Sequence, residues 1–154
     1  MLRIFISILI FTWATSAFSQ QERAVQWLSF EQLSEALQKQ PKKVFIDFYA
    51  DWCSPCLKMQ RDVFTNPEVI AVLNEHYYAV KMNVESTDTI HFGYQKFINK
   101  RAKKRNPIHE IPLLLASQKD KPFSLPALIF MDEQFKATAR YFQSLNAEQL
   151  LKIL

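Results

Sequence analysis

The chain has 154 residues, of which 49% are hydrophobic and 14% aromatic, and its formal net charge at pH 7 is +4. This length and apolar content fit one globular domain with a hydrophobic core, and they exclude a disordered chain. The modest positive charge is not by itself a nucleic-acid signature, so we expect no nucleic-acid partner.

The N-terminus has the pattern of a secretory signal. Arg3 supplies the positive end, residues 4–14 form an apolar stretch, and the small residues Ala17 and Ser19 stand at the usual cleavage spacing. The apolar stretch is shorter than the ~20 residues that a bilayer-spanning helix needs, which argues against an uncleaved anchor. We therefore predict a signal peptide over residues 1–19, with cleavage near Ser19 and Gln20, and export of the mature protein.

Strand and helix signals alternate along the rest of the chain. In chain order, the predicted elements are a strand at 24–28, a helix from Ser29 to before Pro41, a strand at 43–49, a helix at about 54–64, a helix from Pro67, strands at 77–84, 127–131 and 135–142, and a helix after Asn146. Ser29 with Gln32 fits a capping box, and Asn66 fits an N-cap. The pattern predicts an α/β sheet with helices on both sides.

The only two cysteines, Cys53 and Cys56, directly follow the apolar strand at 43–49 and begin the next helix. A helix N-terminus carries partial positive charge, which favours the thiolate form of the first cysteine and makes it the attacking nucleophile. A structural disulfide would close too short a loop to stabilise the fold much, and one C-x-x-C is half of a zinc site without further ligands. We interpret the pair as a redox-active disulfide that needs no metal and no cofactor.

The residues around these cysteines resemble the active site of the thioredoxin family. The run Trp52-Cys53-Ser54-Pro55-Cys56 is similar to the family's W-C-x-P-C motif, and Leu125-Pro126-Ala127 is similar to its cis-proline loop. The resemblance implies the thioredoxin fold, an α/β fold with a central mixed sheet flanked by helices. The expected organisation is a single domain at 20–154, with an insertion at about 86–122 before the cis-proline loop.

A closer resemblance is to the C-terminal domain of DsbD-type thiol reductases. The runs at 48–53 and 63–69 are both similar to that group. This resemblance implies an exported, periplasmic protein that acts on protein disulfide substrates. It also implies a DsbD-like membrane protein as the electron donor.

The resemblance assigns roles to single residues. Cys53 is expected to attack a substrate disulfide, and Cys56 then to attack Cys53 and release the reduced substrate. Asp47 falls where the family has a buried acid, and desolvation is expected to raise its pKa so that it serves as general base for Cys56. Lys81 falls where a lysine neighbours that acid, and a purely structural Asp47–Lys81 pair is the alternative.

Substrate binding is expected at Trp52, Leu125 and Pro126. By resemblance Pro126 is cis, which leaves the backbone of Leu125 free to pair with an extended substrate. Trp52 is either a rigid apolar platform at the site or a partly buried core residue.

The expected insertion is rich in basic residues, which gather between Lys96 and Arg105. A solvated basic helix is the expected structure of this segment. The functional hypothesis is a docking surface for an acidic partner or an anionic membrane. Because the insertion precedes the cis-proline loop, a second hypothesis is that it shapes a substrate groove.

The direction of electron flow is inferred from the two residues between the cysteines. Ser54-Pro55 contains no histidine and is similar to the Gly-Pro of thioredoxin, whose reduction potential is about −270 mV, against about −120 mV for the oxidant DsbA. We therefore expect a thiol:disulfide oxidoreductase that works as a reductase. A thiol oxidase or disulfide isomerase is one alternative, and a binding module that acts through its basic insertion is another.

Overall fold

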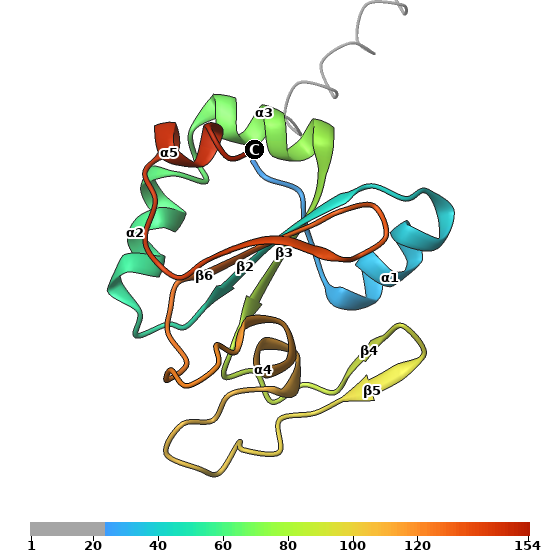
Figure 1. Cartoon of the computed structure of the whole chain (residues 1–154), viewed down its shortest axis with the longest axis vertical. Coiled ribbons are helices and arrows are strands. Elements are labelled where there is room, and N and C mark those ends of the chain that lie inside the picture. Colours follow the sequence, from blue (N-terminus) through green and yellow to red (C-terminus); the bar gives the residue numbers. More distant parts are fainter. Residues whose placement is uncertain (1–23) are drawn as a thin grey trace, which may run out of the picture.

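The structure, a computed structural model, describes residues 24–154 (Figure 1). The signal peptide predicted at residues 1–19 lies outside the described residues. Within residues 24–154, none of the helices has the length and apolar character needed to span a membrane.

All of the elements predicted outside the insertion are present, most of them with shorter ends. In chain order they are β1 (Trp27–Leu28), α1 (Phe30–Lys39), β2 (Lys43–Tyr49), α2 (Ser54–Asp62), α3 (Pro67–His76), β3 (Tyr77–Asn83), β4 (Ile90–Phe92), β5 (Gln95–Phe97), α4 (Glu110–Ala116), β6 (Ala127–Met131), β7 (Ala137–Tyr141) and α5 (Ala147–Leu151). The capping box of Ser29 and Gln32 and the N-cap at Asn66 are both formed, which confirms these local predictions.

Five strands form one mixed sheet in the order β1-β3-β2-β6-β7. β1, β3 and β2 run parallel, whereas β6 pairs antiparallel with β2 and β7 pairs antiparallel with β6. Figure 1 shows α3 and α5 on one side of the sheet and α1 and α4 on the other. The predicted central mixed sheet flanked by helices is therefore confirmed.

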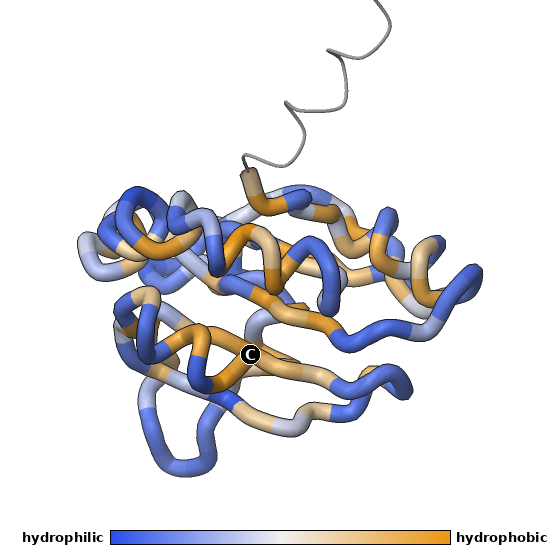
Figure 2. Tube along the Cα trace, turned by 90° about the horizontal axis from the view of Figure 1, so that it is seen from above, coloured by the Kyte–Doolittle hydropathy of each residue, from blue (hydrophilic) through white to orange (hydrophobic). Residues whose placement is uncertain are grey.

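The central strand β2 is buried on both faces of the sheet. Ile46 and Phe48 point into a core with residues of α1 and α4, while Phe45 points into a second core with residues of α2 and α3. Hydrophobic residues gather along these inner faces, and hydrophilic residues mark the projecting loops (Figure 2). Because side chains alternate along a strand, Asp47 shares the face of Phe45.

The basic segment in the expected insertion has a different structure from the one predicted. Lys96 lies in β5, which pairs with β4, and residues 98–109 form turns and irregular backbone, so the predicted basic helix is wrong. In a helix, like charges three or four residues apart would repel one another, and this basic segment has no apolar face that a helix would bury. The Asn99 amide instead fixes the loop by donating to the carbonyls of Ser86 (3.0 Å) and Pro107 (2.7 Å).

His109 attaches the insertion to the body of the protein. Its backbone N–H donates to the carbonyl of Val84 at 2.8 Å, at the end of β3. Its ring is fully buried: Nδ1 accepts a hydrogen bond from the Ile111 N–H, and Nε2 lies 3.2 Å from the carbonyl of Asp88. This bonding fits a neutral ring that donates from Nε2, and burial lowers the pKa of His109 below its usual value of 6.5.

We expect His109→Ala to lower the free energy of unfolding by about 2–4 kcal/mol at about pH 8, because it opens a cavity and leaves the buried N–H of Ile111 without its partner. The folded-state pKa of His109 is lowered, so the stability that its neutral ring contributes is complete above about 6.5. That contribution is lost as the pH falls through the folded-state pKa. Denaturant unfolding should therefore show a larger difference between wild type and variant at about pH 8 than at about pH 5.

His91→Ala is the matched control, because His91 is an exposed histidine of β4. We expect it to change the free energy of unfolding by less than about 0.5 kcal/mol. An equal loss of stability for His109→Ala at both pH values would contradict a buried neutral ring.

Candidate active site

Cys53 lies at the junction of β2 and α2. Its N–H donates to the carbonyl of Ala50 at 3.0 Å, which closes a tight turn after the strand, and Cys53 is the N-cap of α2. The Cys53 Sγ accepts a hydrogen bond from the N–H of Cys56 at 3.3 Å. Pro55 lies in the first turn, where a missing N–H removes no helical hydrogen bond. The Cys53 sulfur thus lies at the positive end of a helix, an arrangement that favours a thiolate.

The sulfurs of Cys53 and Cys56 are joined in a disulfide. Both residues are buried, with 3% of Cys53 and 1% of Cys56 exposed, whereas Trp52 is 68% exposed. Trp52 is therefore not a partly buried core residue.

A chain of hydrogen bonds holds the redox loop, residues 50–53 between β2 and α2, against the end of β3. Trp52 Nε1 donates to Glu85 Oε1 at 2.8 Å, and the N–H of Glu85 donates to Asn83 Oδ1 at 2.9 Å. Asn83 Nδ2 in turn donates to Asp51 Oδ2 at 3.1 Å. These polar residues were not singled out from the sequence, but a signal existed: they follow the carboxyl ends of two predicted parallel strands, where functional groups gather.

Asp47 is a charged residue in the middle of the buried strand β2. Only 2% of it is exposed, and its Oδ2 is buried without a hydrogen-bond partner in the described part of the chain. Burial raises the pKa of Asp47 to about 7, and the positive charge of Lys81 offsets part of this effect. A carboxyl group in this state exchanges a proton near neutral pH, as a general base requires.

Lys81 is the neighbour of Asp47 across the β2–β3 pair. Its Nζ lies 4.8 Å from the ring centroid of Tyr49 and 5.9 Å from that of Trp27, which are cation–π distances. Within residues 24–154 Lys81 forms no ion pair with Asp47, so it acts on the carboxylate through its field rather than through a direct bond.

The loop before β6 brings the second half of the sequence to the redox site. The Leu125–Pro126 peptide bond is cis, and Leu125 lines a cavity of about 370 Å³ together with Trp52. Glu85 and Ile108 also line this cavity, so the redox loop, the end of β3, the insertion and the proline loop all meet there. The structure thus places Trp52 and Leu125, which are distant in the sequence, at one surface hollow.

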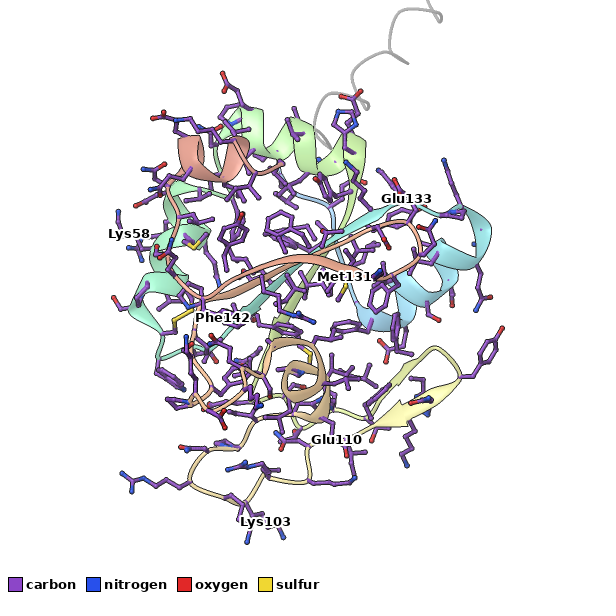
Figure 3. All side chains as sticks on the ribbon, viewed as in Figure 1. Lys58, Lys103, Glu110, Met131, Glu133 and Phe142 are labelled. Carbon is purple, nitrogen blue, oxygen red and sulfur yellow. A yellow bond between two sulfur atoms is a disulfide. The ribbon has the colours of Figure 1, made fainter. Side chains whose placement is uncertain are left out.

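The basic residues between Lys96 and Arg105 lie outside this hollow. The side chains of residues 100–105 are exposed, and Lys103 extends beyond α4 at the outer end of the loop (Figure 3). Among the described residues, no three His, Cys, Asp or Glu side chains converge on a possible metal position.

Three comparisons relate the chain to known proteins. A family model described as thioredoxin-like matches residues 26–132. The thiol:disulfide interchange protein DsbD of Vibrio vulnificus strain CMCP6 is 31% identical over 129 residues, which cover 79% of this chain and 18% of DsbD. The chain therefore corresponds to less than a fifth of the length of that relative.

Solved structures show the same fold at lower sequence identity. A thioredoxin from Thermus thermophilus has a TM-score of 0.58 and 17% identity, and the match covers 84% of each chain. The reduced C-terminal domain of Neisseria meningitidis DsbD has a TM-score of 0.50 and 20% identity, with 79% of this chain and 86% of that one covered. The fold, the disulfide at the start of α2 and the match to the family model together show that this chain belongs to the thioredoxin-like family.

Proposed function

We propose that the protein is an exported, periplasmic thiol:disulfide oxidoreductase that reduces disulfides in protein substrates. The observation that carries the proposal is the Cys53–Cys56 disulfide at the N-terminus of α2, beside an exposed tryptophan and a cis-proline loop. Export rests on the sequence pattern of residues 1–19, with residues 20–154 as one mature domain. The similarity to a thiol:disulfide interchange protein supports the type of chemistry.

The reaction is two successive thiol–disulfide exchanges. In the reduced protein, the thiolate of Cys53 attacks one sulfur of the substrate disulfide, that S–S bond breaks, and the departing thiolate takes up a proton. Cys56 then loses its proton and attacks the Cys53 sulfur in the mixed disulfide. This step releases the second substrate thiol and forms the Cys53–Cys56 disulfide, so two electrons have passed to the substrate. A dithiol donor, for which we propose a DsbD-like membrane protein, restores the reduced pair.

Asp47 and its neighbours serve the second exchange. We assign Asp47 as general base for Cys56, acting through water, because its buried carboxyl has a pKa of about 7. Lys81 keeps that pKa from rising further. Trp52 and Leu125 offer the surface on which the substrate lies while the sulfurs exchange, next to Pro126, which is buried.

We favour reduction over oxidation because no histidine lies between the two cysteines. The hydrogen bond that the Cys53 sulfur accepts comes from the backbone N–H of Cys56. We expect the mature domain, equilibrated with thiol buffers, to have a reduction potential of about −270 mV. A potential of about −120 mV would make the protein an oxidase or isomerase instead.

Cys56→Ser should accumulate mixed disulfides with protein substrates, because the second exchange has lost its nucleophile. Cys53→Ser is the control and should trap none. Nonreducing gels of the exported fraction, with and without a reductant, measure the difference. Mixed disulfides that form equally with Cys53→Ser would contradict the assignment of Cys53 as the attacking residue.

We expect Asp47→Asn to stabilise the oxidised protein. Its pKa is about 7 in the folded state against 3.8 in the reference state, so the carboxyl group destabilises the fold increasingly as the pH rises between these values. The gain in unfolding free energy should be small at about pH 4 and reach about 4 kcal/mol at about pH 8. Thermal or denaturant unfolding at both pH values measures it.

The same variant should slow the release of reduced substrate by at least about tenfold near neutral pH. Asp120→Asn is the matched control, because Asp120 is exposed and in a left-handed conformation that asparagine adopts readily. A stability gain that is independent of pH would show that Asp47 is not a desolvated acid.

A further inference from the structure

The cavity beside the redox disulfide has a wall that the insertion supplies. Ile108 belongs to the insertion, and Phe123 follows directly after it. Both side chains are partly buried and pack against the same core as the two cysteines, as does Leu125. The cavity volume of about 370 Å³ is in the range of sites that enclose a small ligand group. The hollow is therefore a largely apolar recess supported by the core.

Its position fits a side chain of a substrate that is already bound at the disulfide. Trp52, the residue directly before Cys53, lines the recess together with Leu125, which packs on the core cluster that contains both cysteines. In an extended polypeptide, residues two positions apart point to the same side and are separated by about 7 Å. A polypeptide joined to Cys53 would therefore bring the residue two positions from its reacting cysteine towards the recess that Trp52 and Leu125 line.

Glu85 limits which side chain enters. One carboxylate oxygen of Glu85 accepts the indole N–H of Trp52 at 2.8 Å, which holds this negative charge at the wall of the recess. An acidic side chain would be repelled there. A basic side chain would be attracted by that charge but would lose its hydration among Ile108, Phe123 and Leu125. A large apolar side chain has neither penalty.

The charge of the surrounding surface is unevenly distributed. Residues 86–122 carry eight Lys or Arg and three Asp or Glu, a net charge of +5, whereas residues 24–85 and 123–154 carry nine and eleven, a net charge of −2. In the loop at 100–105, Lys100 pairs with Glu110. The other basic residues of the loop form no ion pair with any of residues 24–154 and are exposed: Arg101, Lys103, Lys104 and Arg105. Asn106, the next residue, lines the recess.

We propose that the insertion makes this protein selective for polypeptide disulfides that combine a large apolar side chain, two positions from the reacting cysteine, with acidic residues beyond it. The apolar side chain fills the recess, and the acidic residues lie along the basic loop. This inference rests on the proposed thiol:disulfide chemistry and names its substrate class. An anionic bilayer would also attract the loop, but the recess opens beside the sulfur pair, which favours a polypeptide.

The test compares disulfide-linked peptides with the reduced mature domain as electron donor. Three peptides carry Phe, Ser or Lys two positions from the cysteine, each with acidic flanks. A fourth peptide carries Phe with basic flanks. We expect kcat/KM to be at least about tenfold higher for Phe than for Ser or Lys. Acidic flanks should give at least a roughly threefold higher kcat/KM than basic flanks, and about 1 M salt should remove that difference.

Phe123→Ala should abolish the preference for Phe over Ser. Phe97→Ala is the matched control, because Phe97 is also a partly buried phenylalanine packed on the same core, yet it does not line this recess. Each rate is divided by the rate of the same variant with a small uncharged disulfide. Equal preferences in the wild-type protein, or a loss of preference with both variants, would overturn the recess as the selective element.

Lys103→Glu/Lys104→Glu should abolish the preference for acidic flanks. Lys39→Glu/Lys136→Glu has the same net charge change on exposed residues of α1 and the β6–β7 turn, and should keep the preference. If the loop variant keeps the peptide preference and loses only binding to anionic phosphatidylserine vesicles, the loop serves a membrane and the acidic-substrate inference is wrong. If wild-type protein fails even with the small disulfide, the proposed function itself is wrong.

Discussion

The burial of β2 on both faces is the constraint on which the rest of the structure depends. A strand with one core above it and another below cannot shift or twist away. The turn at Ala50 therefore holds Cys53 at a fixed place beyond the C-terminal end of β2. The same burial removes water from Asp47, which shares the strand. A rigid support for the sulfurs and an acid with a raised pKa are thus two results of one packing arrangement.

Much of this could be predicted from the sequence because its signals are local. The apolar run of β2, the capping box at Ser29 and the Asn66-Pro67 start of α3 each depend on residues within a few positions of one another, and all are formed. The cysteine pair at the start of α2 has the same local character. In this part of the chain, short-range preference and long-range packing favour the same structure.

The insertion could not be predicted in the same way. Its fold depends on His109, which reaches back to Val84, and on Asn99, which bonds backbone groups on both sides of the loop. No periodic pattern indicates such contacts, and the basic run taken alone predicts a helix that its own charges oppose. The Trp52–Glu85 bond escaped prediction for the same reason: the partners are 33 residues apart and meet only because β2 and β3 are parallel neighbours.

The attachment of the insertion through His109 has an evolutionary consequence. The loop at 98–108 begins and ends at anchored positions, and its exposed side chains support no part of the sheet. Mutations can therefore change its length and charge while β2, Cys53 and Asp47 stay as they are. A protein built in this way can acquire new substrates through mutations in one surface loop, while the thiol–disulfide exchange at its cysteines stays unchanged.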